Sequence, residues 1–388
     1  MKKLKLILGA LTAAAIVAGC GGGGGTATST GLGINTVKVV GDSLSDSGVF
    51  GIKFAMQGSV AEPMQIWTER IAATYGAASL CPRYAATSAS TVALNPAAAA
   101  CTSYAVGGGR INIPTAPTSG FSIPEQLKQL AIDKTYGAGD LLLVDGGGND
   151  AADLTGAYLK VSTDGGASYS GLLKTLVASG TVDSTLATGA AGFVSAGNLY
   201  MTALADKFYD VIKLEALDRG AARIAVLNMP GITNTPRFQD TLNLVALANG
   251  GGVAGATARA TVEAVIKGWA ETFNARLASK FAGNSKVVLV DFYTGFNDQV
   301  ANPSDYALTN VRTPACPSTG TGTDGLPTYN AATCTSTALS AMTPPVGATG
   351  GANWWRTYAF SDGFHPTMFG YQLLAQAVAK DLAKAGWL

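Results

Sequence analysis

The chain has a single histidine, His365, among its 388 residues. So few imidazoles exclude a histidine-rich metal centre, and a reaction that needs a histidine base can use only this residue. His365 stands three residues after Asp362, in the sequence Ser-Asp-Gly-Phe-His-Pro. An aspartate beside a histidine can orient the imidazole and stabilise its charged form, so the two are a candidate acid–base pair.

Charged residues are also scarce, at 13% of the chain, which is about half the usual share. The 26 basic residues nearly balance the 25 acidic ones, and losing residues 1–19 would remove three lysines and leave 23 basic residues. A near-neutral chain of this kind is a poor partner for nucleic acid. In place of charged residues the chain is rich in Ala, Gly, Ser and Thr. This composition favours an exported protein with an uncharged, hydroxyl-rich surface.

The N-terminal apolar run, residues 6–17, is too short for a membrane-spanning helix, which needs about 20 residues. It follows three lysines and precedes Val-Ala-Gly-Cys, a pattern typical of an export signal. The residues that end at Cys20 resemble the lipobox of bacterial lipoproteins. This resemblance implies a lipoprotein signal peptide at 1–19 and a membrane anchor on lipidated Cys20. The alternative is an ordinary secretion signal with an incidental cysteine.

Residues 20–35 are rich in Gly and Thr and are expected to form a flexible tether. Gly21 is not aspartate, so the lipobox resemblance favours the outer membrane or cell surface over the inner membrane. Residues 36–388 are then expected to be one domain, with insertions near 155–192 and 302–353 whose composition departs from the core pattern. Both insertions should be surface loops near the active edge, or plain decoration.

Five cysteines are present, and if Cys20 carries lipid, an even number remains in an oxidising compartment. We predict disulfides between near neighbours, Cys81–Cys101 and Cys316–Cys334, although four cysteines allow three connectivities. A zinc site is the rival interpretation, but the chain has no C-x-x-C pair to support it.

Short apolar runs alternate with amphipathic segments along the chain, which predicts an α/β fold with three layers, α/β/α, around a parallel sheet of about five strands. The predicted strands are 36–40, 104–106, 140–145, 223–228 and 286–291, and the predicted helices are 61–75, 124–135, 199–217, 256–281 and 366–385.

Polar and glycine motifs follow three of these strands. Asp42-Ser43 follows the first, Gly107-Gly108 the second, and Gly148-Asn149-Asp150 the third. The carboxyl ends of parallel strands meet at one sheet edge, where ligands bind in open α/β sheets. The three motifs are therefore expected to form one site.

Four ordered blocks of sequence resemble those of the GDSL, or SGNH, hydrolases. They are Gly-Asp-Ser-Leu-Ser at 41–45, Tyr-Ala-Val-Gly-Gly at 104–108, Gly-Gly-Asn-Asp at 147–150 and Asp-Gly-Phe-His-Pro at 362–366. The resemblance implies a flavodoxin-like (SGNH) fold and a catalytic triad of Ser43, Asp362 and His365. It also implies an oxyanion hole built from Ser43, Gly108 and Asn149, with Gly107 as the alternative glycine, and no metal or cofactor.

Each of these residues also has a purely structural interpretation. Ser43 could cap a helix after the first strand, Asn149 and Asp150 could be turn residues, and His365 could be an ordinary loop histidine. Asp42 and Asp46 are interpreted as structural hydrogen-bond acceptors. The aromatic residues Trp354, Trp355 and Phe360 are candidates for an acyl pocket or, more simply, for the core.

The ordered set predicts a serine esterase or lipase that hydrolyses carboxylic esters through an acyl-enzyme intermediate. Its substrate would be a lipid, a small ester or a polymer ester. One alternative is an acyltransferase that uses the same triad, and a second is a non-catalytic, surface-binding lipoprotein.

Overall fold

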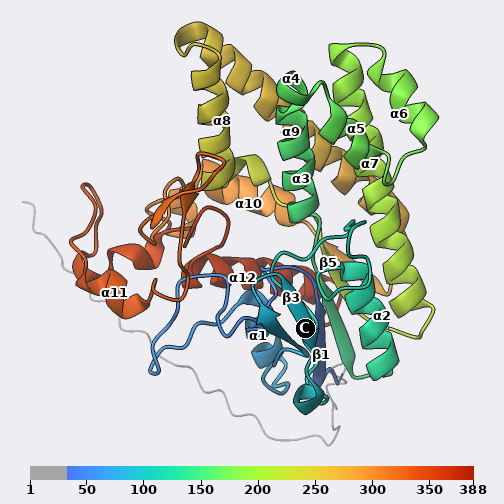
Figure 1. Cartoon of the computed structure of the whole chain (residues 1–388). Coiled ribbons are helices and arrows are strands. Elements are labelled where there is room, and N and C mark those ends of the chain that lie inside the picture. The colour runs from blue at the N-terminus through green and yellow to red at the C-terminus, as the bar shows by residue number, and fades with distance from the viewer. Residues whose placement is uncertain (1–32) are drawn as a thin grey trace, which may run out of the picture. The chain divides into compact units, whose positions relative to one another are not determined.

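The computed structural model describes residues 33–388 (Figure 1). The predicted signal peptide, Cys20 and most of the predicted tether lie outside the described residues. Within residues 33–388, no helix is both long and apolar enough to cross a membrane.

A parallel sheet of four strands lies at the centre, in the order β1-β4-β5-β6. The strands are β1 (Thr36–Val40), β4 (Asp140–Val144), β5 (Ile224–Leu227) and β6 (Val287–Val290). In register, Val39 pairs with Leu143, and Leu143 pairs with Ala225. All four strands are runs of mainly apolar residues, as expected for a sheet that helices cover on both faces. The predicted α/β class is confirmed.

The predicted strand at 104–106 is reduced to an extended segment along the free edge of β1. The amide of Val39 donates to Thr102 O (3.0 Å), and the amide of Tyr104 donates to Val39 O (2.7 Å). Only one bridge, Val39–Ser103, forms there. The contact with β1 ends where the amide of Val106 donates to Gly41 O (3.2 Å), and the next amide, that of Gly107, donates to the Asp46 carboxylate. It still delivers the Gly107-Gly108 motif to the carboxyl edge of β1.

Helices cover both faces of the sheet. Strand side chains alternate between two apolar clusters, with Val39 and Leu143 in one and Val40 and Val144 in the other, as the twofold period of a strand requires. The first cluster includes side chains of α1 (Trp67–Thr74), α10 (Phe292–Ala301) and α12 (Met368–Lys384), and the second those of α2 (Ile123–Asp133), α7 (Ala190–Ile212) and α9 (Gly252–Phe281).

Most predicted helices are present with shifted ends. The helix expected at 61–75 begins only at Trp67, because the side chain of Glu69 reaches back to accept the amide of Ile66 (3.0 Å) and fixes the start there. The helix expected at 199–217 is α7, which starts earlier and ends in a π-helical turn at Lys213–Leu217.

The insertion near 155–192 forms helices, whereas its composition suggested a loop. Its side chains Tyr169, Leu173 and Val182 are buried in the same cluster as α7 and α9, so tertiary packing overrides the weak helix propensity of its Gly, Ser and Thr residues. The helices are α3 (Gly148–Leu159), α4 (Val161–Asp164), α5 (Ala167–Leu173) and α6 (Ser179–Leu186).

Two arms rise beyond the carboxyl edge of the sheet (Figure 1). One is α3–α6, which starts directly after β4. The other contains α8 (Pro236–Ala248), which was not predicted, and the first part of α9. The remaining strands form two antiparallel hairpins in the loops. One pairs β2 (Tyr84–Ser88) with β3 (Thr91–Leu94), and the other pairs β7 (Gly320–Thr321) with β8 (Pro327–Thr328). A short helix, α11 (Ser336–Ala341), also lies in a loop.

Candidate active site

Ser43 lies on a tight turn directly after β1. The amide of Ser45 donates to Asp42 O (3.1 Å), and the amide of Leu44 donates to Asp42 Oδ1 (3.0 Å), which closes the turn. The next helix, α1, begins only at Trp67, so Ser43 does not cap a helix. The turn leaves the Ser43 side chain partly exposed at the carboxyl edge of the sheet.

Ser43, His365 and Asp362 form one line of hydrogen-bonding side chains. His365 Nε2 lies 2.8 Å from Ser43 Oγ, and His365 Nδ1 lies 2.8 Å from Asp362 Oδ2. Asp362 Oδ1 also accepts the backbone amides of Phe364 and His365, each at 2.8 Å. The short loop before α12 therefore presents both side chains toward the turn after β1, as the spacing of three residues predicted.

Charge and burial act in opposite directions on this pair. Burial disfavours the aspartate charge, but the His365 charge and the hydrogen bonds to Asp362 prevail and lower the pKa of Asp362. Burial likewise disfavours the imidazolium, but the Asp362 carboxylate, with help from Asp42, prevails and raises the pKa of His365 above its usual value. The pair is thus arranged to stabilise a charged imidazolium beside Ser43.

Two backbone amides in the motifs after β1 and its neighbouring segment are free to donate. The amide of Gly107 donates to Asp46 Oδ2 (2.7 Å). In the described part of the chain, the amides of Ser43 and Gly108 donate to no protein acceptor. Gly108 has φ +80°, a backbone conformation that suits glycine. Of the two candidate glycines, Gly108 therefore has the free donor.

Asn149 lies in the first turn of α3, next to the turn that carries Ser43. Its Nδ2 donates to Gly109 O (2.9 Å) and lies 3.5 Å from Asp42 Oδ2. The structure therefore brings the Asn149 amide beside the residue that precedes Ser43. Neighbouring Asp150 is a backbone anchor, because its carboxylate accepts the amides of Ile111 (3.0 Å) and Asn112 (2.8 Å).

Buried carboxyl groups hold these loops in place. Asp46 accepts the amides of Gly48 and Val49, each at 2.8 Å, in addition to Gly107, and burial raises its pKa to about 6. Beneath the Ser43 turn, Asp145 Oδ1 accepts the Ser45 hydroxyl (2.6 Å), and burial raises the pKa of Asp145. A Cβ on Gly41 would lie 1.6 Å from Asp145 Oδ1, so only glycine fits there.

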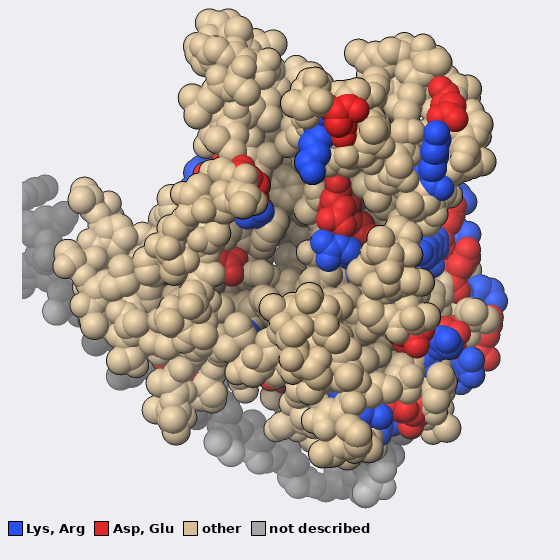
Figure 2. Space-filling view, in the orientation of Figure 1, with Lys and Arg blue, Asp and Glu red and all other residues tan. Residues whose placement is uncertain are grey.

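A cleft of about 1090 Å³ opens from Asn149 and Phe364 and runs between the two arms. Figure 2 shows the molecule hollowed between these arms. Most of the lining is apolar, and its two long walls come from α3 and α8. The lining includes Ala152, Thr155 and Leu159 of α3, Phe238, Leu244 and Val245 of α8, and Val262 of α9.

The charges in this cleft are mainly paired. Arg110 contacts Asp153 (2.6 Å), and Arg237 contacts Asp324 at the tip of the β7–β8 hairpin. Sequence reasoning missed Arg110, Arg237 and the whole of α8. The proline at the start of 236–248 and its spaced apolar residues are the signal that could have revealed this helix.

Both predicted disulfides are present, Cys81–Cys101 and Cys316–Cys334. The aromatic residues Trp354, Trp355 and Phe360 are buried in the core on the α12 side of the sheet. They do not line the cleft. The aromatic residues that line the cleft are Tyr158, Phe193, Phe238 and Phe364. Phe238 and Phe364 contact each other edge to face, with 6.0 Å between ring centroids.

The fold and the site together define an α/β protein with a Ser–His–Asp line at the carboxyl edge of its parallel sheet. A family model described as GDSL-like Lipase/Acylhydrolase matches residues 37–378, so the chain belongs to this family. A comparison with curated proteins gives no match. The family supports a hydrolytic enzyme.

Proposed function

We propose that the protein is a carboxylic ester hydrolase in which Ser43 is the nucleophile. The observation that carries this proposal is the continuous line from Asp362 through His365 to Ser43, with 2.8 Å at each step. A histidine in this position can take the proton of the serine hydroxyl, and the aspartate holds the imidazole in the required tautomer.

The reaction would proceed in two steps. Ser43 Oγ attacks the ester carbonyl while His365 Nε2 takes its proton, and the imidazolium then protonates the departing alcohol to leave an acyl-Ser43 ester. Water next attacks this ester while His365 Nε2 takes its proton. The imidazolium then returns the proton to Ser43 Oγ as the bond between the acyl carbon and Oγ breaks, and the acid is released. The raised pKa of His365 suits it to hold the proton between transfers.

The oxyanion would be held by the backbone amides of Ser43 and Gly108 and by Asn149 Nδ2. The first two amides have no protein acceptor among the described residues, whereas Asn149 Nδ2 would have to exchange its long contact with Asp42 Oδ2 (3.5 Å) for the oxyanion while keeping its bond to Gly109 O. Fixed donors of this kind stabilise the negative oxygen of the tetrahedral intermediate.

We assign the acyl part of the substrate to the cleft between the arms. From Phe238 to Ala248 the α8 wall extends for about 15 Å at 1.5 Å per residue. In an extended acyl chain, carbon–carbon bonds of about 1.52 Å at near-tetrahedral angles give a length of about 1.25 Å per carbon. The α8 wall therefore matches an extended chain of about twelve carbons. The paired arginines leave little net charge to attract an anionic substrate.

Hydrolysis of a p-nitrophenyl ester series, from acetate to palmitate, tests the assignment. We expect turnover that Ser43→Ala lowers by about 10⁴-fold or more, with folding unchanged. Ser47→Ala is the matched control, because the Ser47 hydroxyl is buried without a partner and its loss should leave turnover intact. Retained activity in Ser43→Ala would refute the nucleophile.

We further propose that the protein is an exported lipoprotein, held at the outer membrane or cell surface by lipid on Cys20. The lipobox resemblance at residues 17–20 supports this proposal. We expect Cys20→Ser to move the protein from the membrane fraction to the soluble exported fraction. If the variant stays with the membranes, Cys20 is not the anchor.

A further inference from the structure

Ser361, the residue before Asp362, joins three segments of the chain. It is fully buried. Its amide donates to His365 O (2.7 Å) and its hydroxyl donates to Pro366 O (2.8 Å), which closes the loop that carries Asp362 and His365. The hydroxyl also accepts the amide of Met56 (3.0 Å), in the segment that continues from the Ser43 turn.

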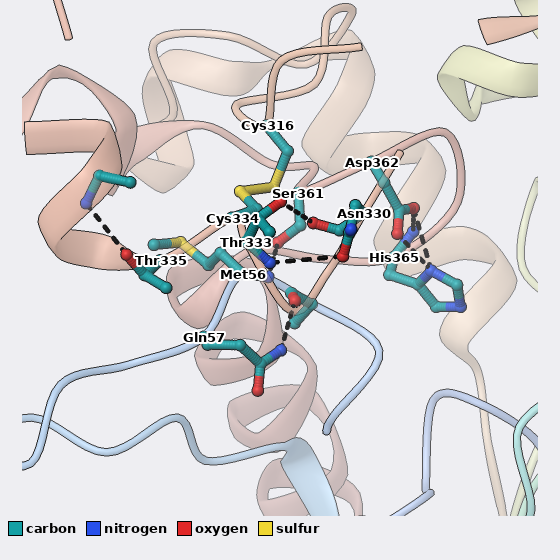
Figure 3. The surroundings of a disulfide bond; sticks show 12 residues. Met56, Gln57, Cys316, Asn330, Thr333, Cys334, Thr335, Ser361, Asp362 and His365 are labelled. Atoms are coloured by element: carbon teal, nitrogen blue, oxygen red, sulfur yellow. Dashed lines mark hydrogen bonds and ion pairs between the residues drawn. A yellow bond between two sulfur atoms is a disulfide. The ribbon is translucent and has the colours of Figure 1, made fainter. Parts of the chain in front are cut away.

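The Cys316–Cys334 disulfide contacts the same two segments that Ser361 joins, the loop of Asp362 and His365 and the segment after Ser43 (Figure 3). The amide of Cys316 donates to Ser361 O (2.9 Å), and Cys334 O accepts the amide of Gln57 (2.7 Å). Each half-cystine is thus bonded to a different partner, one in the acid–base loop and one in the segment after Ser43. The covalent bond ties these two partners together.

The other disulfide has no such link. Cys81 O accepts the amide of Ser103, at the start of the extended segment beside β1. This contact precedes the Gly107-Gly108 motif in the chain, and it involves neither Ser43 nor the loop that carries Asp362 and His365. The two disulfides nevertheless span similar stretches of chain, 20 and 18 residues.

We infer that Ser361 and the Cys316–Cys334 disulfide are positioning elements that fix His365 and Asp362 against Ser43. This inference rests on the proposed function for its kinetic readout. A displacement of about 1 Å in such a geometry can cost about 100-fold in rate, so the disulfide affects turnover beyond its effect on stability.

The test compares Cys316→Ser/Cys334→Ser with the matched control Cys81→Ser/Cys101→Ser. Loops of similar length lose similar stabilisation when a disulfide is removed, so both variants should show comparable drops in Tm. We expect kcat to fall roughly 10- to 100-fold in the first variant, with KM changed less than about threefold. The control should keep kcat within about threefold of the unaltered protein. Equal kcat values in the two variants would overturn the inference.

A second pair of variants keeps both disulfides, for the case in which the first variant fails to fold. Ser361→Ala removes one hydroxyl from the junction, and Ser103→Ala removes a hydroxyl that is equally buried but has no partner. We expect kcat to fall in Ser361→Ala by as much as in Cys316→Ser/Cys334→Ser, and we expect Ser103→Ala to leave kcat unchanged. Matching kcat values in this pair would also overturn the inference.

A readout independent of turnover comes from the single histidine. In tag-free protein, the NMR titration of the one imidazole reports His365 directly, and the charges that act on it are those of Asp362 and Asp42. Ser361→Ala should move its midpoint toward the usual value of about 6.5, whereas Ser103→Ala should not. An unmoved midpoint contradicts the inference, whereas absence of ester turnover in the unaltered protein contradicts only the proposed function.

Discussion

At the scale of single residues, the donors that the site can offer are those that do not already form a hydrogen bond within the protein. The amide of Gly107 donates to the Asp46 carboxylate, whereas the amide of the neighbouring Gly108 has no protein acceptor among the described residues. The sequence predicted Gly108 only from resemblance and left Gly107 open, because two adjacent glycines have the same local propensity. The contact that distinguishes them joins residues 61 positions apart.

His365 gives a pH prediction at the same scale. Below its pKa the imidazole is protonated and cannot accept the Ser43 proton, so activity is lost on the acid side. Because the Asp362 charge raises this pKa, kcat/KM should rise with pH through a midpoint above the usual value of about 6.5. A pH profile of kcat/KM checks this, and a midpoint at or below that value would contradict it.

At the scale of elements, close packing fixes the crossing of α7 with α9. Helix α7 packs against α9, where Gly197 lies against the ring of Trp269. Trp269 Nε1 also donates to Val194 O (3.1 Å), so the ring has little freedom to move. Periodicity predicted parts of both helices, but the requirement for glycine at this crossing comes only from their contact.

A pair of Gly→Ala variants tests this packing. A Cβ at Gly197 would lie 2.2 Å from Trp269 Cε2, so Gly197→Ala should destabilise the protein by about 1–3 kcal/mol. Gly268, in α9 beside Trp269, has open space around its Cβ position, and Gly268→Ala should stabilise by up to about 1 kcal/mol through helix propensity. Thermal or urea unfolding measures both, and equal effects would refute the packing argument.

At the scale of the whole molecule, the cleft is built from segments that lie far apart in the sequence. It is lined by α3 after β4, by α8 after β5, and by Leu326 of the hairpin loop between the cysteines of the second disulfide. None of these segments forms a cleft alone. Their assembly at one sheet edge places an apolar surface next to Asn149 and Phe364, where an acyl chain would extend from Ser43.

A substitution in the cleft should therefore change chain-length preference more than catalysis. Val245→Asp places a charge in the apolar wall and should lower kcat/KM for long p-nitrophenyl esters by roughly 10-fold or more, with acetate little affected. Leu247→Asp on the exposed side of the same helix is the control. If both variants lose long and short esters alike, the acyl chain does not lie in this cleft.

The sequence alone determined the α/β class and the residues of the candidate triad. It could do so because these depend on local periodicity and on short ordered motifs around Ser43 and His365. It also predicted the two disulfide pairings, but the structure selected them from three possible connectivities. Tertiary structure decided which of the two glycine amides is free, and it also decided the helical arms, the cleft and the link from Cys316–Cys334 through Ser361. These depend on contacts between residues distant in sequence, such as Met56 and Ser361, and local pattern carries no information about such contacts.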